Sequence, residues 1–174
     1  MTLPTWDLFI TLFFLVALAY GFILGRGRIA VILVITYVAY AVASEVGEAA
    51  YRLFTGPTNI VTNISIQGSG SLFAVKTAFF ALIIVLVSLK GEGALGGLGR
   101  GLKSTLLTGV YAFLNAGLIV SCVIKFLPPD SQASLFSISP LAAKVDSYRA
   151  WWLLLPAVIM IVEGFLRSKE EVKE

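Results

Sequence analysis

The chain alternates between long apolar runs and short polar segments. In lipid, every backbone amide must be hydrogen-bonded within its own segment, so apolar runs long enough to cross a bilayer are expected to be helices. A transmembrane helix needs about 20 such residues, with a range of about 17–25. Five runs stand out, at about residues 6–24, 29–46, 72–89, 106–127 and 151–166. The pattern predicts an all-α, polytopic membrane bundle of four to five transmembrane helices, forming a single membrane domain over residues 1–174.

The fifth run, 151–166, is the shortest of the five and contains Pro156 and Glu163. This run has two possible interpretations. It either spans a thin region of the bilayer with its ends at the interface, or it lies in the interface. Trp151 and Trp152 at its start, like Trp6 at the start of the first run, are typical of the aromatic belt at a membrane surface.

Composition supports the bilayer as the main partner of the chain. Hydrophobic residues make up 58% of it and charged residues 13%, whereas a soluble domain carries about 25% charged residues. The sequence has no histidine and one cysteine, Cys122, which removes histidine-based catalysis and the commonest metal sites. The net charge of +3 comes without a long basic tract. We therefore expect no enzymatic activity, no catalytic residue, no cofactor, no metal and no nucleic acid.

The distribution of basic residues predicts the orientation. Cytoplasmic loops of membrane proteins carry the excess of Lys and Arg. The connections after the first, third and fifth runs contain eight of them, and the opposite side contains at most five. The eight are Arg26, Arg28, Lys90, Arg100, Lys103, Arg167, Lys169 and Lys173. We expect a bacterial cytoplasmic (inner) membrane protein with its N-terminus outside and its C-terminus in the cytoplasm.

Small residues recur every fourth position on the first two helices. Ala17, Gly21 and Gly25 share one face of the first, and Ala39 and Ala43 share one face of the second. Residues four apart lie on the same side of a helix, and small ones let two backbones approach closely. Because the link between the two runs is short, we expect these faces to pack against each other in an antiparallel hairpin.

A few polar residues lie within or at the edges of the apolar runs, where ionisable groups are functional candidates by default. The candidates are Asp7, Glu45, Lys76, Asn115 and Glu163. Each also has a structural explanation. Asp7 complements the dipole at the start of the first helix, and the Asn115 amide is expected to bond to a neighbouring helix.

The acidic candidates have basic residues within reach. Glu163 has Arg167 one turn away, and Glu48 has Arg52 at the same spacing, which favours a local ion pair in each case. Glu45 has Lys76 or Lys125 as possible partners, because all three are expected near the outer face.

The first helix resembles the opening of the colicin V production (CvpA) family of bacterial inner-membrane proteins. The resemblance rests on Trp6-Asp7, an apolar run, and Gly21-Phe22-Ile23-Leu24-Gly25 with arginines beyond it. Residues 109–120 are similar to the last helix of that family, and Ser139-Pro140-Leu141 is similar to the segment that follows. The chain departs from the family at Asn115-Ala116, where an arginine is usual, and by its fifth run. The resemblance implies a role in colicin V export or production, biofilm formation or envelope integrity.

Two functions remain open at this point. The first is a non-enzymatic membrane protein that assists export, assembly or envelope maintenance through helix–helix contacts with a partner membrane protein or with a second copy. The second is a small oligomeric channel or transporter whose pathway uses Glu45, Lys76, Asn115 or Glu163.

Overall fold

The computed structural model describes residues 5–55, 69–90 and 102–171, and these residues form seven helices. They are α1 (Trp6–Leu24), α2 (Arg26–Thr55), α3 (Ser69–Lys90), α4 (Leu102–Phe126), α5 (Pro129–Ile138), α6 (Pro140–Ser147) and α7 (Arg149–Glu171). The prediction of an all-helical fold is confirmed. α1 has the bounds of the first apolar run, whereas α2, α3 and α7 extend beyond both ends of theirs.

The short helices α5 and α6 lie in a segment that the sequence indicated only as a connection. Each begins with a proline, Pro129 or Pro140. Proline suits the first turn of a helix, because the N–H that it lacks would have no partner there. The hydroxyl of Ser139 also caps α6 by accepting from the Ala142 N–H at 3.1 Å. These local signals are strong enough to form helices too short and too polar to span.

Four helices are long and apolar enough to cross a membrane: α1, α2 up to Leu53, α3 from Leu72, and α4 from Ser104. A fifth span exists if α6 and α7 count as one, since they pass the same test together although they are bent by 53° at their junction. The expected four to five spans are therefore confirmed, and both readings of the fifth run remain open.

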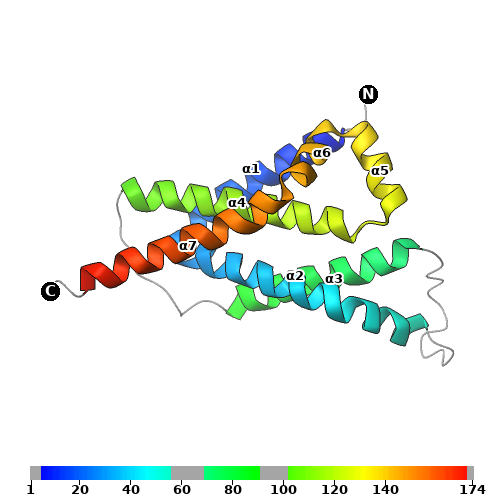
Figure 1. The fold of residues 1–174 in the computed structure, drawn as a ribbon, viewed down its shortest axis with the longest axis horizontal. Helices are drawn as coiled ribbons and strands as arrows, with labels where there is room; N and C mark the ends of the chain where they lie inside the picture. The colour runs from blue at the N-terminus through cyan, green and yellow to red at the C-terminus, as the bar shows by residue number, and fades with distance from the viewer. Residues whose placement is uncertain (1–4, 56–68, 91–101, 172–174) are drawn as a thin grey trace.

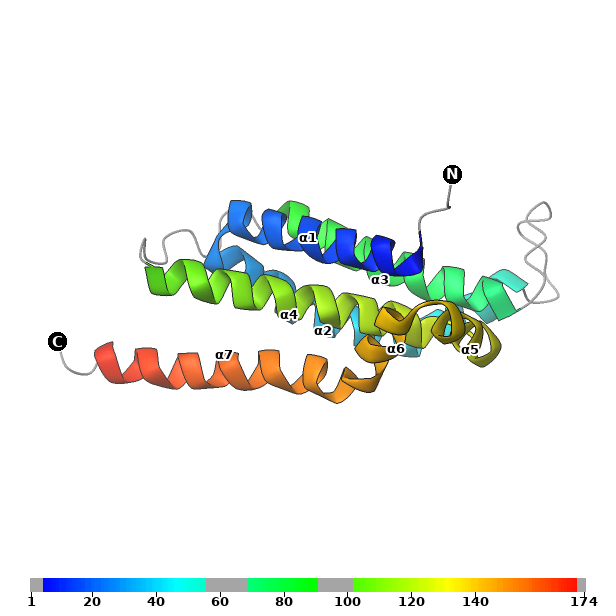
Figure 2. The ribbon, with the colours of Figure 1, turned by 90° about the horizontal axis from the view of Figure 1, so that it is seen from above.

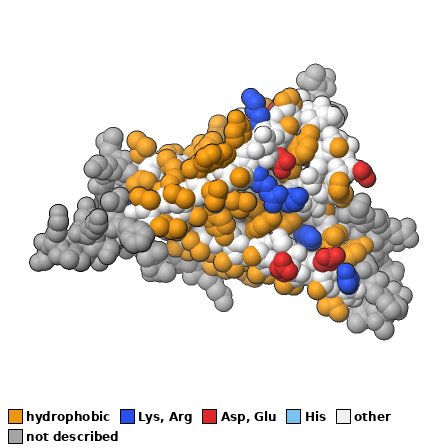
Figure 3. All heavy atoms as spheres, viewed as in Figure 1, with side chains coloured by type: hydrophobic (Ala, Val, Ile, Leu, Met, Phe, Trp, Pro, Cys, Tyr) orange, Lys and Arg blue, Asp and Glu red, His pale blue; other side chains and the backbone are white. Residues whose placement is uncertain are grey.

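The central helix of the bundle is α4, which packs against α1, α2, α3, α6 and α7 (Figures 1 and 2). In its apolar stretch 61% of residues are buried inside the protein, against 11% for α1 and 6% for α3. α1 and α3 therefore turn most of their surface outwards, where a bilayer would meet it. Figure 3 shows apolar side chains over much of one face, with charged ones gathered towards the side where α5 lies.

Two ends of the bundle can be distinguished. The start of α1 lies beside α5 and α6, and we call this the α5 end; the end of α7 lies at the opposite end (Figure 2). α7 is longer than the run that predicted it, with 23 residues. It packs on α4 through Trp152, whose ring lies so close to Gly117 that a Cβ there would be 2.2 Å from it. Trp152 is thus partly inside the bundle, whereas Trp6 and Trp151 are exposed.

The small-residue faces have other partners than expected. Gly21 faces Ala112 of α4, and a Cβ on Gly21 would lie 2.4 Å from the Ala112 Cβ. Ala39 and Ala43 are buried in a cluster with Phe80 of α3 and residues of α4. The expected packing of Gly21 on Ala39 and Ala43 is wrong, because α1 packs mainly on α4 and only lightly on α2.

The remaining two positions of the α1 pattern behave differently from Gly21. Gly25 has φ +79°, in the region that glycine adopts most easily, and a Cβ on it would meet nothing within 4 Å. Gly25 therefore serves the turn between α1 and α2, which begins at the next residue, and not a close helix–helix contact. Ala17 is half-buried.

Candidate functional site

Polar contacts join the antiparallel helices α2 and α7 at three levels. Arg26 forms an ion pair with Glu163. The Tyr37 hydroxyl donates to the Leu153 carbonyl at 2.5 Å, and the Arg149 guanidinium donates to the Tyr40 hydroxyl at 2.7 Å. The residue numbers of the partners rise along α2 as they fall along α7, as expected for two antiparallel helices. We call these contacts the polar seam.

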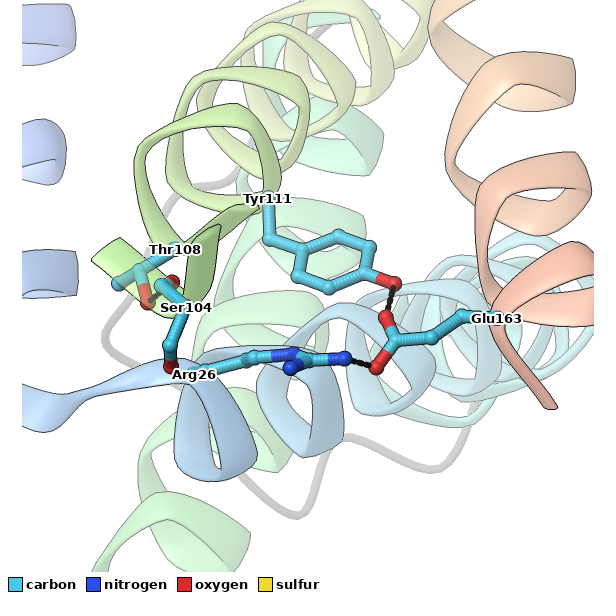
Figure 4. A network of polar contacts seen from close by, with 5 residues as sticks. All are labelled: Arg26, Ser104, Thr108, Tyr111 and Glu163. Atoms are coloured by element: carbon cyan, nitrogen blue, oxygen red, sulfur yellow. Dashed lines mark hydrogen bonds and ion pairs between the residues drawn. The ribbon is translucent and has the colours of Figure 1, made fainter. Parts of the chain in front are cut away.

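The contact at the start of α2 belongs to a three-residue cluster (Figure 4). One carboxylate oxygen of Glu163 pairs with an Arg26 Nη, and the other accepts from the buried Tyr111 hydroxyl. The Arg26 and Glu163 side chains are 16% and 21% exposed. Three helices, α2, α7 and α4, thus meet on one carboxylate.

The local fold explains how Arg26 reaches this place. Gly25 turns the chain sharply, and Arg26 is the first residue of α2. Its Nε is buried without a hydrogen-bond partner. Figure 4 also shows Thr108 beside the cluster. The Thr108 hydroxyl donates to the Ser104 carbonyl of its own helix at 2.8 Å, so it is not directed at Glu163.

In this cluster the negative charge of the Glu163 carboxylate is compensated by the Arg26 guanidinium. Removing one partner from a buried ion pair is costly, because it leaves a charge without compensation in a low dielectric. Glu163 has both oxygens occupied, so its carboxylate can hold three helices together. Among the described residues, no three Cys, Asp or Glu side chains are close enough to hold a metal ion.

Asn115 makes the interhelical bond that the sequence predicts. The hydroxyl of Thr36 on α2 donates to the Asn115 Oδ1 on α4 at 2.9 Å. Both side chains are buried. The amide is therefore used in packing α2 against α4.

Asp7 does more than complement the dipole of its own helix. Its Oδ1 accepts from the Ser139 hydroxyl at 2.5 Å and from the Leu141 N–H at 3.2 Å. These bonds fasten the start of α6 to the start of α1. Sequence reasoning identified Asp7 but not this contact with residues more than a hundred positions away.

The other two candidates do not join a site. Glu45 is exposed, and no ion pair among the described residues includes it, so the expected pairing with Lys76 or Lys125 is not observed. The stem of Lys76 lies against Gly47 on α2. The predicted Glu48–Arg52 contact is present at 3.6 Å between two exposed side chains.

Sequence reasoning missed Arg26 and Tyr111. Arg26 was counted only as an orienting charge. The structure gives Glu163 a partner that is distant in sequence, and the expected partner Arg167 lies outside the residues whose side chains are described. An arginine and a glutamate predicted at the same membrane face were the one available signal. Nothing distinguishes Tyr111 from the other tyrosines before the fold is known.

Comparisons of the chain with models of known families, with curated proteins and with solved structures found no match. The resemblance to the colicin V production family therefore rests on the motifs alone. By its helices, the chain is a multi-pass membrane protein.

Proposed function

We propose that this protein is a non-enzymatic membrane protein that acts through contacts of its outward-facing helices with a partner membrane protein or a second copy of itself. The observation that carries the proposal is the unequal burial of the spans. Only 11% of the α1 stretch and 6% of the α3 stretch is buried within the chain, against 61% of α4. Two of the four spans thus leave most of their surface available to other helices.

The use of the polar residues supports the same proposal. Glu163 and Asn115 are occupied by partners within the chain, Arg26 with Tyr111 and Thr36 respectively. Asp7 fastens α6. These groups fix the shape of the bundle, and a rigid bundle presents its outer helices in a defined arrangement.

The cellular role is proposed on the resemblance to the colicin V production family. It is assistance to export or assembly, or maintenance of the envelope, in the inner membrane of a bacterium. The motifs that support this role are Asp7, the turn from Gly21 to Gly25, and Ser139-Pro140-Leu141.

Photo-crosslinking in native membranes tests the proposal. A photoreactive amino acid replaces Leu15 on α1 or Leu86 on α3, which are 62% and 51% exposed; Leu33, with 0% exposure, is the matched control. We expect discrete protein adducts from positions 15 and 86 and none from position 33. Adducts with lipid alone at both exposed positions would contradict the proposal.

A second candidate is a small oligomeric channel or transporter. The observation that favours it is the placement of Arg26 and Glu163 at one level of the helix bundle, because ionisable residues in such positions often mark ion or proton pathways. Asn115 lies further along the same interior, on α4. Ion flux into liposomes that contain the unaltered protein or its Glu163→Gln variant separates this candidate from the first.

A further inference from the structure

A groove of about 630 Å³ lies between α1, α3, α4 and α5. Its apolar lining comes from all four helices and includes Phe9 and Phe13 of α1, Phe73 of α3, Ile119 and Val123 of α4, and Ile138 of α5. Its volume lies within the range of about 300–1,000 Å³ that is typical of sites for small molecules.

The polar residues of the groove all belong to α5. Asp130, Ser131 and Ser134 line it, and all three are exposed. Among the described residues that line the groove, Asp130 is the only charged one. Trp6 also lines it, and an indole of this kind is typical of the headgroup level of a membrane. The groove is thus apolar along α1 and α4 and acidic at α5.

We propose that this groove binds one phospholipid whose headgroup carries an ammonium group, as in phosphatidylethanolamine. An acyl chain lies along α1 and α4, and the ammonium lies beside the Asp130 carboxylate. The lipid comes from the leaflet at the α5 end, since α5 lies there (Figures 1 and 2).

Two observations select this occupant. The groove is bordered by α1, which is almost unburied within the chain, so it opens where acyl chains are the surrounding solvent. A purely anionic headgroup would meet the Asp130 carboxylate without a lining Lys or Arg to compensate, whereas an ammonium complements it. The groove is lined by residues of α1 and α3, the helices that carry the partner contacts proposed above, but retention of a lipid by the purified protein does not depend on those contacts.

Native mass spectrometry of the purified protein, incubated with equal amounts of phosphatidylethanolamine and phosphatidylglycerol, tests the proposal. For the unaltered protein we expect one retained lipid per chain. An exposed ion pair is weak, so phosphatidylethanolamine should be preferred by about threefold.

Two pairs of variants locate the site. Ser134→Phe should fill the groove and abolish retention, whereas Ser137→Phe, at an exposed α5 serine that does not line the groove, should retain lipid. Asp130→Asn should retain one lipid but lose the preference for phosphatidylethanolamine. Glu45→Gln, which removes an exposed carboxylate elsewhere, should keep it.

Three results would overturn the proposal. They are equal retention by the Ser134→Phe and Ser137→Phe variants, a preference of the unaltered protein for phosphatidylglycerol, and capture of a protein segment by a photoreactive residue at Phe13. The last result would assign the groove to a partner helix.

Discussion

Glu163 of α7 contacts two other helices through its side chain. Its two oxygens bind Arg26 of α2 and Tyr111 of α4, so its own helix α7 is fixed to both by one carboxylate. The rest of the polar seam consists of a tyrosine bonded to a backbone carbonyl and an arginine bonded to a tyrosine. The only ion pair of the seam is therefore at Glu163, and its loss should be felt more than the loss of either other contact.

Glu163→Gln should lower the free energy of unfolding by about 3 kcal/mol, at the low end for a broken buried ion pair because both side chains keep some exposure. Thermal unfolding in detergent measures the loss. Glu45→Gln, at an exposed glutamate, is the matched control and should change little.

Ion flux into liposomes measured on the same two variants separates the two functions. A structural Glu163 predicts no flux with the unaltered protein or with either variant. Flux that disappears in Glu163→Gln while that protein remains folded would favour the channel or transporter instead.

At the scale of elements, the position of α1 depends on how closely its backbone approaches α4. Gly21 and Ala112 lie opposite each other with no room for a further methyl group. In lipid, helices associate through van der Waals contact and not through exclusion of water, so such closeness is a main source of stability.

Gly21→Ala should therefore destabilise the bundle, by about 1–3 kcal/mol, the usual range for an overpacked contact. Ala112→Gly in the same chain should restore most of the loss, because it removes the methyl group that the new Cβ meets. Ala19→Leu, on an exposed side of α1, is the control for added bulk. The midpoint of thermal unfolding gives all three values, and an unchanged midpoint in Gly21→Ala would contradict the contact.

The spans could be predicted from the sequence because length and hydropathy are local properties, and α1 has the predicted bounds. The Asn115 bond could be predicted too, since a buried amide in an apolar helix needs a partner on a neighbouring helix. Which helices pack against each other could not be predicted from the sequence. The short link at Gly25 makes α1 and α2 neighbours in sequence, but α4 provides the complementary surface at Ala112. The Arg26–Glu163 pair joins residues too far apart for any local pattern to connect them.

At the scale of the whole molecule, α7 decides how many times the chain crosses the membrane. α1 to α4 are four candidate spans. α7 runs from the α5 end to the opposite end (Figure 2), packs on α4 and contacts α2 through the polar seam. If α7 spans, its end lies on the other side of the membrane from the α5 end. The excess of basic residues then predicts the α5 end outside and the end of α7 in the cytoplasm.

Cysteine labelling of intact cells checks this arrangement. In a Cys122→Ala background, a cysteine at Ser137 on α5 should react with an impermeant reagent added outside. A cysteine at Lys169, near the end of α7, should react only after the membrane is opened. Equal labelling of both from outside would mean that α7 does not cross the membrane.

The Arg26–Glu163 pair also has a consequence for how the protein is made. Arg26 enters the membrane with the first hairpin, whereas its counter-charge belongs to α7, which is synthesised after the other six helices. Before Glu163 is synthesised, the Arg26 guanidinium lacks the carboxylate that it pairs with in the folded protein. We expect it to stay at the bilayer surface, where water solvates its charge, until α7 is inserted. When α7 is inserted, the Glu163 carboxylate compensates the charge of Arg26. A chain interrupted before α7 would keep an uncompensated charge that quality-control proteases can recognise.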